Sequence, residues 1–144
     1  IIFKRLIFIR KGINMAAGKY SFVIEQGATT DLNIEWKDSA GSPINLNGYH
    51  GRMQIRTDYG GTLICNLTSS ADGSPGDADG TGLNMSGSNG TTHLSSGSIG
   101  IFISAASSSN FNFGEAKYDL ELVKGSVVTR LLEGRVKLSK NITV

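Results

Sequence analysis

Few residues in this 144-residue chain could carry chemistry, and their spacing does not form a known catalytic arrangement. His50 and His93 are the only histidines, and neither has a cysteine, aspartate or serine near it in the order of a nucleophilic triad. We interpret both as loop or surface histidines. The sequence therefore assigns no catalytic residue and predicts a protein that is not an enzyme.

A group of aspartates could instead gather around a calcium ion. Asp72, Asp77 and Asp79 lie in the stretch ADGSPGDADG, and carboxylates are preferred calcium ligands. The spacing lacks the D-x-D-x-D-G ladder and the closing glutamate of a calcium loop, and aspartate-glycine pairs are common turn formers. We therefore expect turns here, with no metal and no other cofactor.

Two further features have chemical and structural interpretations. Asp119 and Glu121 could act as a glycosidase pair, but they share one face of a predicted strand with basic neighbours, which is typical of a solvated surface. Cys65 is the only cysteine, which excludes an intrachain disulfide and a cysteine-based metal cluster. We expect it to be a small residue of the core.

The elements that position these residues are predicted to be strands. The chain has 19 glycines and 2 prolines, a composition typical of all-β proteins with many turns. Apolar residues recur at every second position in runs such as Leu32 to Trp36 and Ile99 to Ile103, and only residues 104–109 could form a short helical turn. These runs predict an antiparallel β-sandwich of about seven to nine strands. The expected core residues are Trp36, Ile55, Ile101, Tyr118, Leu120, Leu122, Leu131 and Val136.

The last third of the chain predicts a hairpin. With Lys124-Gly125 as a two-residue turn, Tyr118 would face Leu131, Leu120 would face Thr129, Leu122 would face Val127, and Asp119 would meet Arg130 on the wet face. The inward residues of the second strand would then be odd-numbered up to Leu131, whereas Val136 and Leu138 are even-numbered. We therefore expect a bulge at Gly134, which adds one residue and restores the alternation. A three-residue turn is the alternative. It removes the bulge but turns Arg130 toward the core, which costs more than leaving it in water.

Residues 68–98 have a different composition from the strands. They form one long segment rich in glycine, serine, threonine, asparagine and aspartate, with few large apolar residues. We expect an exposed loop excursion between strands, with a short hairpin around 81–85. Long loops of this kind are often functional.

The first fourteen residues, IIFKRLIFIRKGIN, precede the first methionine and carry four basic side chains. We interpret residues 1–14 as a non-native upstream extension or a disordered arm, and 15–144 as a single sandwich domain. A signal peptide or a membrane anchor fits less well, because the segment is too short to span a bilayer and lacks a clean apolar region. Its four basic residues change the net charge from +2 for the whole chain to −2 for the rest, so we expect no nucleic-acid or membrane partner.

Several longer motifs resemble a known group of proteins. The order of KYSFVIEQG, GSPINLNGYHGRMQIR, SIGIFIS and YDLELVKGSVVTRLLEGRVKLS is similar to that of small virion structural proteins of tailed bacteriophages. It also resembles the immunoglobulin-like N-terminal domain of phage baseplate upper proteins. The likeness covers nearly all of 19–144 except the segment at 68–97. It implies a structural role and an immunoglobulin-like sandwich.

Within that likeness, Ala116-Lys117-Tyr118-Asp119-Leu120 resembles the entry to strand F of immunoglobulin-like domains, in which a tyrosine hydroxyl caps a neighbouring loop. An ordinary core tyrosine is the alternative. Trp36 departs from the pattern, because it falls on the second expected strand and not on the third.

Two functions remain. The first is a virion structural protein of the tail, baseplate, neck or capsid surface, made in the bacterial host cytoplasm and assembling with copies of itself and other virion proteins. The second is a module that binds glycans or the host surface. Sugar binding commonly needs an exposed aromatic ring, and the segment 68–98 has none. This absence favours assembly, with no small-molecule substrate.

Overall fold

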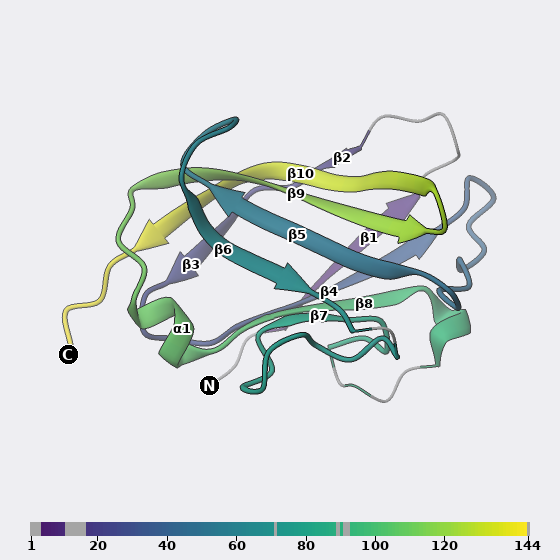
Figure 1. Ribbon diagram of the computed structural model, residues 1–144, viewed down its shortest axis with the longest axis horizontal. Helices are drawn as coiled ribbons and strands as arrows, with labels where there is room; N and C mark the ends of the chain where they lie inside the picture. The colour runs from purple at the N-terminus through teal and green to yellow at the C-terminus, as the bar shows by residue number, and fades with distance from the viewer. Residues whose placement is uncertain (1–3, 11–16, 71, 89, 91–92, 144) are drawn as a thin grey trace.

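A computed structural model describes residues 4–10, 17–70, 72–88, 90 and 93–143, and they form a sandwich of two sheets (Figure 1). The strands in chain order are β1 (Lys4–Arg10), β2 (Gly18–Lys19), β3 (Phe22–Glu25), β4 (Thr30–Lys37), β5 (His50–Arg56), β6 (Leu63–Thr68), β7 (Gly82–Asn84), β8 (Ser98–Ile103), β9 (Glu115–Lys124) and β10 (Val127–Ser139). A 3-10 turn, η1 (Leu94–Ser96), precedes β8, and the helix α1 (Ala105–Ser109) follows it. The prediction of an all-β sandwich is confirmed. The described residues contain ten strands because the N-terminal part adds β1 and the short β2.

Each sheet has a distinct strand order. Sheet A runs β1-β4-β8-β7, and sheet B runs β2-β10-β9-β5-β6, with β3 also paired to β10. The pairs β1–β4, β2–β10 and β3–β10 are parallel, and the other pairs are antiparallel. The strands β4, β8 and β7 take the places of B, E and D in an immunoglobulin domain, and β5, β9 and β10 take those of C, F and G. The architecture is therefore immunoglobulin-like.

The core lies between the inward faces of the two sheets. All eight residues expected in the core are at most 5% exposed. Trp36 lies on β4, the counterpart of strand B, where its ring meets Tyr49 edge-on at 5.4 Å between centroids. It therefore does not take the place of the immunoglobulin tryptophan, which belongs to strand C.

The register of the β9–β10 hairpin differs from the predicted one. The turn is Gly125-Ser126, so Lys124 pairs with Val127, and Leu122 pairs with Thr129. Gly125 has a φ of 59° and no other residue type in the described chain has a positive φ, which is the pattern of a type II′ turn with glycine first. The prediction placed glycine second, as in a type I′ turn, and both that turn and the three-residue alternative are wrong.

The bulge is also in a different place. The pairing shifts by one residue between Arg130 and Leu132, so Leu131 is the extra residue, and both leucines are buried. Gly134 instead pairs regularly with Tyr118, and a Cβ added there would lie 2.0 Å from the carbonyl oxygen of Tyr20. The glycine therefore permits the close approach of the N-terminal segment to β10, which no local pattern indicates.

Tyr118 contacts the same N-terminal segment. Its hydroxyl donates a hydrogen bond to the backbone carbonyl of Tyr20, while its ring packs edge-on against Phe22 at 5.1 Å. The hydroxyl thus binds backbone, but on a segment 98 residues earlier in the chain and not on a loop adjoining strand F. The bond fixes the chain at the point where it passes from β2 to β3.

The segment 68–98 is not exposed throughout. Its middle part forms β7, which pairs with β8 at the edge of sheet A, and it buries Thr81, Leu83 and Met85 almost completely. The next turn is held to sheet A, because the amide of Ser88 donates to Asn33 Oδ1 at 2.9 Å. The expectation of an exposed excursion is therefore wrong for 81–87, since its two large apolar residues enter the core.

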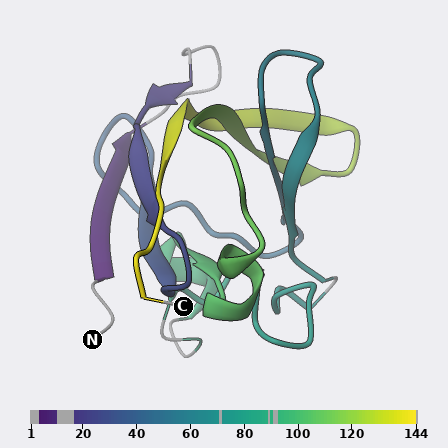
Figure 2. The same cartoon turned by 90° about the vertical axis from the view of Figure 1, so that its left-hand side faces the viewer.

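Residues 4–10 form β1, which pairs in parallel with β4 along its whole length (Figure 2). The segment was expected to be an extension or a disordered arm. The structure gives its backbone an edge position in sheet A. That 1–14 is absent from the natural protein stays a prediction.

Candidate functional site

The residues with predicted chemical potential lie in separate places. His50 begins β5 and is exposed, while the Nδ1 atom of His93 accepts the amide of Ser95 at the start of η1. In the part of the chain that the structure describes, no three His, Cys, Asp or Glu side chains come together as a metal group. His93 therefore has a local structural role in η1, and His50 lies at the surface.

The three aspartates of the 72–79 region serve turns. Asp72 Oδ1 accepts the amide and the hydroxyl of Ser74. Asp79 accepts hydrogen bonds from the Ser104 hydroxyl at 2.6 Å and the Thr81 amide at 3.0 Å, which lowers the pKa of its carboxyl to about 2. Its bond to Ser104 links the loop to the N-cap of α1. Asp77 lies in the same exposed loop.

Cys65 lies on β6 and is partly buried against the core. Burial raises the pKa of its thiol to about 11, and the negative charges of Asp77 and Asp79 contribute in the same direction. The thiolate is the nucleophilic form of cysteine. A thiol with this pKa is almost entirely protonated at neutral pH.

The carboxylates Asp119 and Glu121 lie on the outward face of sheet B. Glu121 pairs with Arg52 at 2.8 Å, and Asp119 pairs with Arg130 at 3.5 Å. Burial and the neighbouring Glu121 charge raise the pKa of Asp119, and together they outweigh the opposite effect of Arg130. The two carboxylates are members of a charged surface that covers the middle of the sheet.

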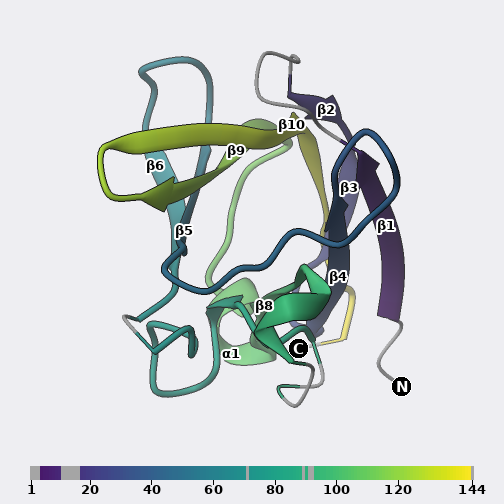
Figure 3. The ribbon, with the colours of Figure 1, turned by 90° about the vertical axis from the view of Figure 1, so that its right-hand side faces the viewer.

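That surface contains a groove of about 470 Å³, which we call the outer groove. Its floor is the outward face of β5, β9 and β10. One wall is the β5–β6 turn, and the opposite wall is the segment that begins at β2, on the other side of β9 and β10 (Figures 2 and 3). The lining residues are Lys19, Ser21, Gln54, Arg56, Asp58, Tyr59, Gly60, Lys117, Tyr118, Asp119, Arg130, Glu133, Gly134 and Arg135.

Charge in the outer groove is mixed, with an excess of cations. Five lining residues are basic and three are acidic. Most form ion pairs, including Lys19 with Glu133 and Lys117 with Asp58 at 3.0 Å. Arg56 differs, because its contacts with described residues are to neutral acceptors, Gln54 Oε1 at 3.0 Å and the Gly61 carbonyl at 2.8 Å. The groove therefore holds one positioned guanidinium without a carboxylate partner in the described chain.

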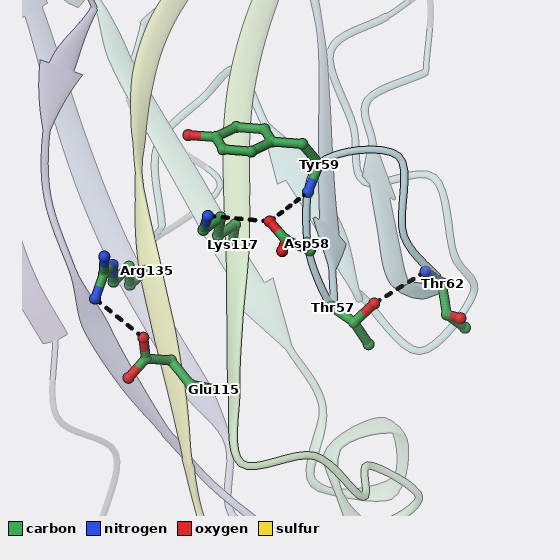
Figure 4. A network of polar contacts seen from close by, with 7 residues as sticks. All are labelled: Thr57, Asp58, Tyr59, Thr62, Glu115, Lys117 and Arg135. Carbon is green, nitrogen blue, oxygen red and sulfur yellow. Dashed lines mark hydrogen bonds and ion pairs between the residues drawn. The ribbon is translucent and has the colours of Figure 1, made fainter.

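An aromatic ring stands at the wall formed by the β5–β6 turn. Tyr59 is 83% exposed, and its ring extends from the turn across β9, with the ammonium of Lys117 4.2 Å from its centroid (Figure 4). Asp58 accepts hydrogen bonds from Lys117 and from the amide of Tyr59, which lowers the pKa of its carboxyl. The bond between the Thr62 amide and the Thr57 hydroxyl at 3.0 Å closes the turn. These contacts fix the turn that presents the ring.

Tyr59 and Arg56 were not predicted as site residues. The glycan alternative depended on aromatic rings in 68–98, and the turn Asp58-Tyr59-Gly60-Gly61 lies outside that segment. A tyrosine in the middle of a glycine-rich turn, directly after an alternating strand, is a signal for an exposed ring. The cross-strand partners on β9 and β10 could not be read from the local sequence.

Comparison with known proteins gives a fold and no family. Among the described residues, no helix has the length and apolar character needed to cross a bilayer. No protein-family profile matches the chain, and no curated protein matches it. A solved structure, the N-terminal domain of phage TP901-1 ORF48, aligns over 95% of this chain and 98% of its own, with a TM-score of 0.50 and 7% identity. At that identity the likeness concerns architecture alone, and the chain has the fold of this phage domain.

Proposed function

We propose that this protein is a non-enzymatic structural component of a tailed-phage virion, which acts by assembling with copies of itself and with other virion proteins. The observation that supports this most is the end-to-end match in fold with a phage protein domain. Because that match covers nearly all of both chains, it concerns the whole domain and not one common supersecondary motif. Under this proposal, the protein belongs to the tail, baseplate, neck or capsid surface of the particle.

The end of the β9–β10 hairpin supplies a contact surface that fits this role. Val127 and Val128 are 61% and 48% exposed, although successive strand residues point to opposite faces. Side chains on both faces of β10 are therefore exposed at the hairpin end, although Val123, opposite Val128 on β9, is buried. The hairpin extends beyond the sandwich (Figure 3). Exposed apolar residues on a projecting hairpin are suited to insertion between neighbouring subunits.

Glycan binding is the alternative, and one observation favours it, the exposed Tyr59 beside a polar groove. The two functions are compatible, because the hairpin end and the outer groove use different residues. A structural subunit could carry a ligand site on its sheet face while its hairpin joins the particle.

The test of assembly is the oligomeric state of the full chain, measured by light scattering after size exclusion, with a panel of hydrolase substrates tested in parallel. We expect a defined oligomer that Val127→Asp and Val128→Asp together convert to monomer, and no turnover. The matched control is Val23→Asp, an exposed valine on β3 that is 50% exposed and distant in sequence from the hairpin. A monomeric wild-type chain with hydrolytic activity would overturn the proposal.

A further inference from the structure

We propose that the outer groove binds an anionic saccharide, with Tyr59 as the platform for a pyranose ring and Arg56 as the partner of its carboxylate or phosphate. This inference goes beyond the virion role and does not depend on it. It rests on the position of one guanidinium, the exposure of one ring, and the mixture of donors and acceptors around them.

Arg56 is prepared to bind an anion. A guanidinium has five N–H donors, and contacts with described residues use two of them, on Gln54 and on the Gly61 carbonyl. The two bonds fix its plane, and the remaining donors are available to the groove. Arginine pairs with carboxylate and phosphate through parallel hydrogen bonds, and a preformed orientation lowers the entropic cost of that pairing.

Tyr59 provides a flat apolar surface in the same groove as this guanidinium. The charge of Lys117 lies over the ring, and the side chain is still 83% exposed. A tyrosine offers a large, rigid and amphipathic contact area with little loss of side-chain entropy. The apolar C–H face of a pyranose ring has the shape and chemistry to pack on such a surface.

The other lining groups favour a sugar over other anions. Asp119, Glu133 and Gln54 present oxygen acceptors, which suit the many O–H donors of a saccharide. The excess of cations is small, five basic residues against three acidic ones, so the groove offers little net attraction to a polyanion such as a nucleic acid or a strongly acidic peptide. A ligand with one negative group and several hydroxyls satisfies both kinds of lining.

The size of the groove agrees with a small ligand. Its volume of about 470 Å³ falls within the range of about 300–1,000 Å³ that is usual for ligand sites. One or two sugar rings fit such a space. A flat protein surface would not fill it.

The test is an NMR titration of the full chain with defined probes, following the Tyr59 amide and the Arg56 Nε–H. The anionic probes are a glucuronic acid–N-acetylglucosamine disaccharide and glucose 6-phosphate, which distinguish a carboxylate from a phosphate as the recognised group. Cellobiose, sodium phosphate and a glutamate pentapeptide separate the contributions of the sugar, the charge and a peptide. We expect saturable shifts at both reporters with at least one anionic sugar. Every comparison probe should bind with an affinity weaker by about tenfold.

Three variants complete the design. Tyr59→Ala and Arg56→Gln should each weaken the sugar complex by about tenfold. Arg52→Gln should not, because Arg52 is an arginine of the same face of β5 that pairs with Glu121 and does not line the groove. The dispersion of each variant's spectrum verifies its fold.

The inference is overturned by the absence of saturable shifts, by equal binding of phosphate or pentapeptide, by equal binding of cellobiose, or by an unchanged affinity of Tyr59→Ala. None of these outcomes alters the assembly test, whose readout is the oligomeric state.

Discussion

The two faces of sheet B are built from the same strands and have opposite uses. On β5 and β9 the inward residues Met53, Ile55, Leu120 and Leu122 are fully buried. The outward residues between them, Gln54 and Glu121, are polar or charged, and they line the outer groove or flank it. One alternation of side chains therefore builds a core on one side and a solvated, ligand-sized surface on the other. Stability should depend on the first face, and recognition on the second.

The largest effect should come from the inward face. Leu120→Ala removes a fully buried side chain from the middle of β9, and we expect a loss of about 2–5 kcal/mol in the free energy of unfolding. Urea denaturation followed by tryptophan fluorescence measures it. A loss no greater than that of Glu121→Gln, the adjacent outward residue, would break the comparison between the faces.

A smaller loss is expected for Tyr118→Phe. The change keeps the ring against Phe22 but removes the hydroxyl that donates to the Tyr20 carbonyl, which should cost about 1–3 kcal/mol of stability. Hydrogen exchange should also increase at the amide of Tyr20, which bonds to the Glu133 carbonyl. Wild-type stability together with unchanged exchange would show that the hydroxyl does not fix the N-terminal segment.

Asp79 lies in an exposed loop and not on sheet B, and its carboxylate accepts several hydrogen bonds. It tests whether such a charge contributes more stability than the outward charges of sheet B. Its pKa is lowered to about 2 by the Ser104 hydroxyl and the Thr81 amide. A carboxyl with a lowered folded pKa adds stability above its unfolded value, near about 3.9, and loses it as pH falls through the folded value. Asp79→Asn should therefore have a lower thermal midpoint than the wild type at pH 6. The difference between the two midpoints should be smaller at pH 2. A difference that is constant with pH would contradict this linkage.

The smallest effect should be that of Arg52→Gln. The Arg52–Glu121 pair lies at the surface, with Arg52 half exposed, and such pairs contribute about 0–1 kcal/mol. The same urea assay as for Leu120→Ala provides the measurement. A loss comparable with that of the leucine variant would mean that the outward charges hold the fold.

The period-two pattern was sufficient to predict the sandwich and its buried residues, because burial on one face of a strand leaves a direct trace in the sequence. Turn chemistry was less informative. Gly125 fits either central position of a two-residue turn, and the choice between them moves every cross-strand pair. The bulge followed from that register, so it was misplaced too.

Features that depend on distant contacts could not be predicted. Gly134 is needed because Tyr20 passes close to it, and the two residues are far apart in the sequence. Leu83 and Met85 looked isolated in a polar segment, although pairing of β7 with β8 brings them into the core. The outer groove has the same origin, since it combines β2, the β5–β6 turn and three strands.

Quantitative mass spectrometry of gradient-purified phage particles, prepared from the source that encodes this chain, tests the central claim most directly. The proposed role predicts peptides of this chain in the particle fraction, at a whole-number ratio to the other virion proteins that is consistent with a symmetric assembly. Peptides that are abundant in the lysate but missing from purified particles would contradict it.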